Sequence, residues 1–96
     1  QEKNREAEAA KEVQAAHVRK MEKRASEEAL MWKTVVFDLE RKTGKAYDKA
    51  TATLTELRQL AIYQGKQDDF QARMTALRKD YGRRKSLLAQ WDRAGL

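Results

Sequence analysis

Few residues of this 96-residue sequence have the side chains on which enzyme chemistry usually depends. The one histidine, His17, lies in a charged segment of a chain that has no cysteine and no second histidine to share a metal ion with it. A general base also needs a partner that orients it, so an exposed His17 without a chemical role is the simpler expectation. The adjacent Asp68 and Asp69 suit the capping of a helix start better than acid–base catalysis. The sequence therefore predicts no enzyme, no cofactor and no catalytic or metal site.

A second group of chemically interesting residues is the basic C-terminal third. Residues 65–96 carry eight Lys/Arg against four acids, whereas residues 1–29 carry seven of each. Clustered cations neutralise phosphates, and Tyr81 and Trp91 are aromatic rings of the kind that stack on bases. The end of a helix explains the same cations, and both aromatic residues fall on an apolar face. Binding of a DNA or RNA backbone is therefore the alternative function, and its candidate residues are Arg78, Lys79, Arg83, Arg84 and Lys85.

The elements that position these residues are expected to be helices. The chain has no proline and four glycines, and strong helix formers dominate it. We expect an all-α fold of antiparallel helices, like a helical repeat or bundle, because the helices follow one another through short connections. The long first helix is expected over Glu2 to Lys42, the second over Ala46 to Gln64, the third up to Gly82, and a short one at the C-terminus. No stretch approaches the roughly 20 apolar residues of a membrane span, and a cytoplasmic protein is expected.

Glycines and short polar residues predict where the helices end and begin. Gly44 suits the left-handed position after the first helix, and Gly65 is the stop signal of the second. Asp68 is the expected N-cap of the third helix, with Gln71 three residues on as its capping-box partner.

The boundary before the C-terminal helix has two interpretations. A break at Gly82 followed by Ser86 as N-cap opens a separate fourth helix. In the alternative, the third helix continues unbroken and Arg84 extends its charged end to solvent.

Apolar residues recur at helical spacing along the first helix, at Val18, Met21, Ala25, Ala29, Trp32, Val36 and Leu39. These spacings of three and four define one face with a near-heptad repeat. Before Val18 the stripe thins to alanines, so residues 1–29 are expected to form a charged overhang and residues 30–96 an antiparallel helical domain. The part of the stripe without an internal partner predicts a protein interface with a second copy or a missing parent domain. Its candidate residues are Val18, Met21, Ala25 and Ala29.

Larger apolar residues are expected to hold the fold itself. They recur at helical spacing in each predicted helix, and they are Trp32, Val36, Leu54, Leu57, Met74, Leu77 and Trp91.

A known pattern runs through about two thirds of the chain. A helix with Tyr-x-x-Ala and paired leucines precedes a second helix, a basic turn, Ser-Leu-Leu and a terminal Ala-Gly-Leu. The residues in these positions are Tyr47, Ala50, Leu54, Leu57, Phe70, Met74, Leu77, Ser86, Leu87, Leu88, Ala94, Gly95 and Leu96. From about Trp32 onward the chain thereby resembles the C-terminal helical tail of bacterial SWIM zinc-finger proteins.

This resemblance implies an α-helical repeat tail, a true C-terminus at Leu96 and a scaffold role without a reaction. The sequence lacks the family's Cys/His motif, so the resemblance implies no zinc site. Lys85 also stands where such tails often have proline.

These patterns together predict a non-catalytic protein-interaction or structural module of a larger intracellular protein. No small-molecule substrate and no membrane partner are indicated. Nucleic-acid binding through the basic C-terminal third is the alternative.

Overall fold

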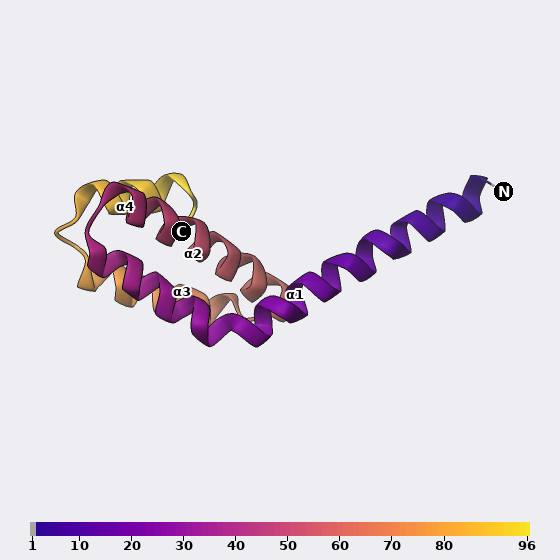
Figure 1. Ribbon diagram of the computed structural model, residues 1–96, viewed down its shortest axis with the longest axis horizontal. Coiled ribbons are helices and arrows are strands. Elements are labelled where there is room, and N and C mark those ends of the chain that lie inside the picture. The colour runs from indigo at the N-terminus through magenta and orange to yellow at the C-terminus, as the bar shows by residue number, and fades with distance from the viewer. Residues whose placement is uncertain (1) are drawn as a thin grey trace.

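A computed structural model describes the backbone of residues 2–96 and the side chains of residues 11–96, and this part of the chain folds into helices without strands (Figure 1). The helices are α1 (Glu2–Arg41), α2 (Gly44–Gln64), α3 (Gln67–Asp80) and α4 (Lys85–Arg93). Consecutive helices alternate in direction, so the α1–α2 and α3–α4 connections lie at the same end of the bundle. The predicted all-α fold of antiparallel helices is confirmed. Gln1 and the side chains of residues 2–10, which belong to the expected overhang, lie outside the described residues.

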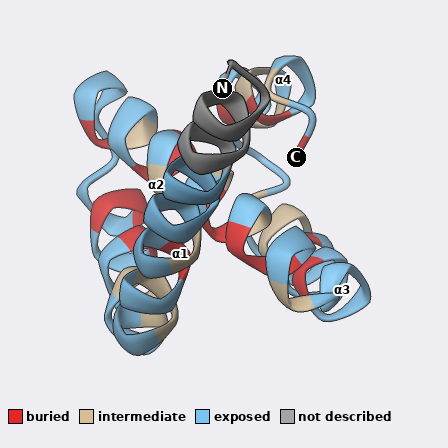
Figure 2. Cartoon of the chain, turned by 90° about the vertical axis from the view of Figure 1, so that its right-hand side faces the viewer, coloured by how far each residue is buried: buried red, intermediate tan, exposed pale blue. Residues whose placement is uncertain are grey.

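Helix α2 is the element against which the others pack. It contacts α1, α3 and α4, and Figure 2, which looks along the bundle, places the four helices around a shared centre. The buried side chains at this centre come from all four helices, and they include Val35, Leu39, Leu54, Leu57, Phe70, Met74, Leu87 and Trp91. Of the residues expected to hold the fold, Leu54, Leu57, Met74 and Trp91 are buried, and Trp32 and Leu77 pack against them half-buried.

The buried face of α1 differs from the predicted stripe. Val35 is 0% exposed and faces the core, whereas Val36 is 46% exposed, so the prediction that Val36 holds the fold is wrong. Met21 and Leu39 are buried as part of the same face as Val35. Adjacent apolar residues at positions 35 and 36 made two neighbouring helix faces compatible with the spacing, and packing against α2 selects the face of Val35.

Helix α1 extends past the rest of the bundle at its N-terminal end (Figure 1). The ring of His17 meets the edge of Tyr63 near the end of α2, with centroids 5.9 Å apart. The contact of α1 with the bundle therefore begins well before residue 30. Nothing tests the division at residues 29 and 30 as a domain boundary, which stays a prediction.

The α1–α2 connection is tighter than the sequence predicts. Lys42, not Gly44, adopts the left-handed conformation, with φ of 57°. Thr43 is the N-cap of α2, and its hydroxyl accepts a hydrogen bond from the Ala46 N–H at 3.1 Å. Gly44 is already the first helical residue, so its predicted role as the glycine that ends α1 is wrong. Thr43 is a favourable N-cap for α2, and this outweighs the usual preference for glycine directly after α1. Gly44 therefore starts α2 and does not end α1.

The α2–α3 connection confirms Gly65 as a stop signal. Gly65 has φ of 69°, its N–H donates to the Ile62 carbonyl, and the next N–H, of Lys66, donates to Ala61 at 2.8 Å. These two bonds satisfy carbonyls that the end of a helix leaves free. Asp68 does not cap α3, because the helix begins at Gln67. The Asp68 carboxylate instead lies in the first turn, where its negative charge interacts favourably with the partial positive charge of the helix N-terminus.

A turn separates α3 from α4, so the unbroken helix is wrong and the break near Gly82 is confirmed. At the C-terminus of α3, the Tyr81 N–H donates a hydrogen bond to the Leu77 carbonyl. In the turn that follows, the Arg84 N–H donates to the Tyr81 carbonyl at 2.9 Å. Helix α4 begins at Lys85, so Ser86 lies inside it and is not its N-cap.

Candidate functional site

An apolar patch is exposed on α1, next to the face that packs against α2. We call it the outer α1 patch, and its residues are Ala29, Leu30, Lys33, Val36 and Phe37. Leu30 and Phe37 are 64% and 65% exposed and lie seven residues apart, which places them about two turns apart on one face. A contiguous exposed apolar patch on a soluble protein often marks an interaction surface. The patch is therefore the strongest candidate for a contact surface.

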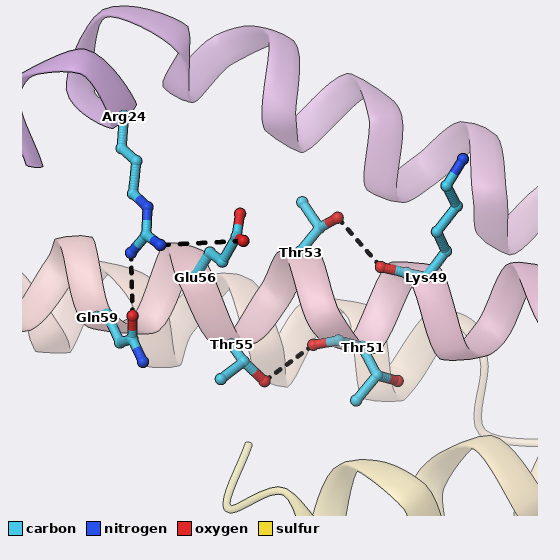
Figure 3. A network of polar contacts seen from close by, with 7 residues as sticks. All are labelled: Arg24, Lys49, Thr51, Thr53, Thr55, Glu56 and Gln59. Carbon is cyan, nitrogen blue, oxygen red and sulfur yellow. Dashed lines mark hydrogen bonds and ion pairs between the residues drawn. The ribbon is translucent and has the colours of Figure 1, made fainter. Parts of the chain in front are cut away.

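Polar contacts between α1 and α2 fix which face of α1 points outward. Figure 3 shows Arg24 reaching from α1 to two side chains of α2. Its guanidinium donates to Gln59 Oε1 at 2.9 Å and lies 3.9 Å from Glu56 Oε1. Because Arg24 is held on the inner face, Phe37 is turned away from the bundle, and Leu30 lies at the rim of a groove that Thr53 and Glu56 of α2 also line.

Aromatic contacts fix α1 against α3 in the same orientation. The rings of Trp32 and Phe70 pack with centroids 6.0 Å apart. The Arg73 guanidinium lies over the Trp32 ring, 4.6 Å from its centroid, in a cation–π contact. A rotation of α1 that covered the outer α1 patch would break these contacts.

The four residues predicted to contact a protein partner differ in how far they are buried. Met21 is only 4% exposed and belongs to the core, so it is not part of a surface. Val18 and Ala25 are half-buried at the edge of the inner face, and only Ala29 is exposed. Sequence reasoning missed Leu30 and Phe37, although their seven-residue spacing on one helix face was a visible signal.

A shallow groove lies at the end of the bundle where the two connections meet. It is lined by Glu40, Lys42, Lys79, Asp80, Tyr81, Gly82, Arg83 and Arg84. Three of the predicted nucleic-acid candidates, Lys79, Arg83 and Arg84, thus share one surface. Lys42 joins them from the α1–α2 connection, which sequence reasoning missed because it lies some forty positions away along the chain.

The other predicted nucleic-acid residues lie outside this groove or are already paired. Arg78 forms an ion pair with Asp92 at 2.8 Å, and Lys85 is exposed at the first position of α4. Trp91 is 0% exposed, so its ring is part of the core and offers no face for stacking on a base.

Tyr81 connects the groove to α1. Burial and, after it, the hydrogen bond that the Tyr81 hydroxyl donates to Glu40 Oε1 at 2.7 Å together raise the pKa of Tyr81 to about 12. The folded chain thus favours the neutral phenol. The contribution of Tyr81 to stability is complete below its ordinary pKa of 10 and is lost as the pH rises from there towards 12.

Glu40→Gln is therefore expected to lower the pKa of Tyr81 towards its ordinary value, since it removes the negative charge and keeps an acceptor at the same place. Titration of tyrosinate absorbance in the wild type and the variant measures this shift. Identical titration curves for the two proteins would contradict the contact between Tyr81 and Glu40.

Neither a metal centre nor a membrane span is found in the described part of the chain. Among residues 11–96, no three His, Cys, Asp or Glu side chains gather closely enough to hold a metal ion. Within the same described region, no helix combines the length and the apolar character needed to cross a membrane.

Comparisons with known proteins give the chain no family. No protein-family model, no curated protein and no solved structure matches it significantly. The resemblance to the SWIM zinc-finger tail therefore stays a prediction, and functional inference depends on the surfaces of the chain itself.

Proposed function

We propose that this chain is a non-catalytic protein-association module, and that the outer α1 patch binds a second copy of the same chain. The observation that carries the proposal is the exposure of Leu30 and Phe37 on a face that the fold holds away from its own core. The single histidine and the described carboxylates form no comparable site for a reaction.

The patch is large enough to matter energetically. Burying a leucine or phenylalanine side chain contributes about 1.5–3 kcal/mol, and a symmetric dimer would bury Leu30 and Phe37 of both copies. Association costs about 4–15 kcal/mol in lost freedom of motion and ordering. Since the two ranges overlap, the apolar contacts alone leave the dimer marginal, and complementary charges around the patch decide its stability.

Charges on the same face of α1 are complementary to those of an antiparallel copy. When Leu30 faces Lys33 of a second α1 running in the opposite direction, Lys23 comes opposite Glu40 of that copy. In the same register Glu22 comes opposite Arg41. By symmetry each attraction occurs twice, and the aliphatic stem of Lys33 covers Leu30 while its ammonium group reaches solvent. A parallel copy in register would instead place each charge beside its own kind.

The mass of the chain in solution tests this association. Sedimentation equilibrium at about 100 μM, a concentration at which a micromolar dimer is saturated, is expected to give the mass of two chains. In the double variant Leu30→Glu, Phe37→Glu, dimer formation would have to bury four carboxylates, which is unfavourable. This variant is therefore expected to have the mass of one chain.

Ile62→Glu is the matched control, because Ile62 is also exposed, at 53%, but lies on α2. This variant is expected to stay dimeric. A wild type with the mass of one chain would contradict a second copy as the partner. Equal dissociation by Ile62→Glu would contradict the outer α1 patch as the surface.

A further inference from the structure

The positive charge of the chain is concentrated at one end of the bundle. Residues 38–49 and 78–85, which flank the α1–α2 and α3–α4 connections, hold nine Lys/Arg and four Asp/Glu, an excess of five. The whole chain has a formal net charge of +6. We call these two segments the basic end. Figure 1 shows both connections side by side at the end of the bundle opposite the N-terminus, and the shared groove joins them.

Helix dipoles do not account for this excess. A helix C-terminus carries roughly half a negative charge, which favours nearby cations, and a helix N-terminus carries roughly half a positive charge. At the basic end, the C-termini of α1 and α3 lie beside the N-termini of α2 and α4. Because these partial charges nearly cancel, the fold supplies no negative end that needs five additional cations.

Pairing within the chain removes only part of the excess. Arg78 is held by Asp92, and Arg41 lies 3.9 Å from the buried Asp38. Lys42, Arg83 and Arg84 are exposed, and the described residues include no ion pair to any of them. These three cations line the same groove and come from both connections.

The groove has the chemistry of a phosphate site more than that of a protein interface. Protein interfaces are centred on buried aromatic or aliphatic side chains. Here Tyr81 is the one large apolar side chain of the lining, and its hydroxyl is already bound to Glu40. Arginine binds phosphate oxygens through two parallel N–H groups, and lysine adds a mobile point charge.

We propose that the basic end binds the phosphate backbone of nucleic acid, with Lys42, Arg83 and Arg84 as its principal contacts. The three contact residues do not belong to the outer α1 patch, but the surfaces are adjacent, because Glu40 lines the groove and also faces Lys23 of the second copy in the proposed dimer. Because the excess of positive charge is the feature that favours binding, affinity is expected to follow the charge of the backbone and not its sequence.

Fluorescence anisotropy with short labelled DNA and RNA duplexes tests this proposal. Binding is expected at about 50 mM salt and is expected to weaken steeply towards 200 mM, since bound cations release counterions from the duplex. The triple variant Lys42→Gln, Arg83→Gln, Arg84→Gln is expected to reduce the slope of log K against log salt by about 3, because each phosphate contact contributes about 0.9. Comparing the DNA and RNA duplexes shows which backbone is preferred.

A matched control removes the same charge from the other end of the chain. The control changes three exposed residues of α1, as Lys11→Gln, Arg19→Gln and Lys20→Gln together. This variant is expected to keep nearly the same slope of log K against log salt as the wild type. Circular dichroism verifies that both triple variants keep their helices. Three results would overturn the proposal: no duplex binding at about 50 mM salt, equal loss in both variants, or binding to anionic lipid vesicles without binding to either duplex.

Discussion

Trp91→Ala is expected to destabilise the fold by about 3–5 kcal/mol, the range measured when a large aromatic side chain is removed from a core. Trp91 is 0% exposed and belongs to the central cluster that joins α4 to the other helices. Domains of this size have a total stability of about 5–15 kcal/mol, so this loss is a large fraction of the whole. Urea denaturation followed by far-ultraviolet circular dichroism measures it.

Two further variants of α4 distinguish the loss of core packing from a general weakening of this helix. Trp91→Phe keeps an aromatic ring and removes an indole N–H that has no acceptor among the described residues, so its cost is expected to be clearly smaller. Asp92→Ala removes only the surface ion pair with Arg78, which is worth about 0–1 kcal/mol. Equal losses for Trp91→Ala and Asp92→Ala would contradict the central position of Trp91.

Val35→Ala is expected to cost about 2–3 kcal/mol, whereas Val36→Ala is expected to cost less than about 0.5 kcal/mol. The two changes remove the same atoms from neighbouring residues of one helix, so helix propensity and the unfolded chain cancel in the comparison. Only burial differs, because Val35 is 0% exposed and Val36 is 46% exposed.

Chemical denaturation of the two variants at a low protein concentration measures this difference without a contribution from association. A larger loss for Val36→Ala would contradict the orientation of α1 and restore the stripe that the sequence spacing favoured. It would also remove the basis for the outer α1 patch, which depends on the same rotation of the helix.

Helix content and helix boundaries could be predicted from the sequence to within a few residues. Strong helix formers and Gly65, whose φ of 69° suits glycine, are local signals, and local signals are readable along the chain. Details of the caps were less predictable. Thr43 and Gly44 are both acceptable next to a helix end, and the choice between them depends on where α2 must start to pack against α1.

The rotation of α1 could not be predicted, because it depends on a neighbour and not on the helix alone. Positions 35 and 36 are both valine, and positions 31 and 32 are both large apolar residues, so two adjacent faces have nearly equal hydrophobicity. Contacts from other helices, such as Arg73 on Trp32, resolve the ambiguity. The predicted interface at Met21 failed for a different reason: α1 packs against the bundle well before residue 30, so Met21 is buried at 4% exposure.

The basic cluster illustrates the same limit at a longer range. Arg83 and Arg84 are neighbours in sequence and could be recognised as a pair. Lys42 joins their groove because antiparallel helices return the chain to the same end of the bundle. The order of the helices could be predicted, but the groove required the side chains to be placed in three dimensions.

A distance measurement across the dimer tests the association of outer α1 patches most directly. The chain has no cysteine, so Lys20→Cys provides a single site for a spin label on an exposed position of α1. In the antiparallel register proposed above, the two labels lie about 35 Å apart along the paired helices, because position 20 of one copy is about 23 residues from position 20 of the other at 1.5 Å per residue. Pulsed electron paramagnetic resonance is expected to show this distance. A short distance between the labels, or no dipolar coupling at all, would contradict an antiparallel dimer formed through Leu30 and Phe37.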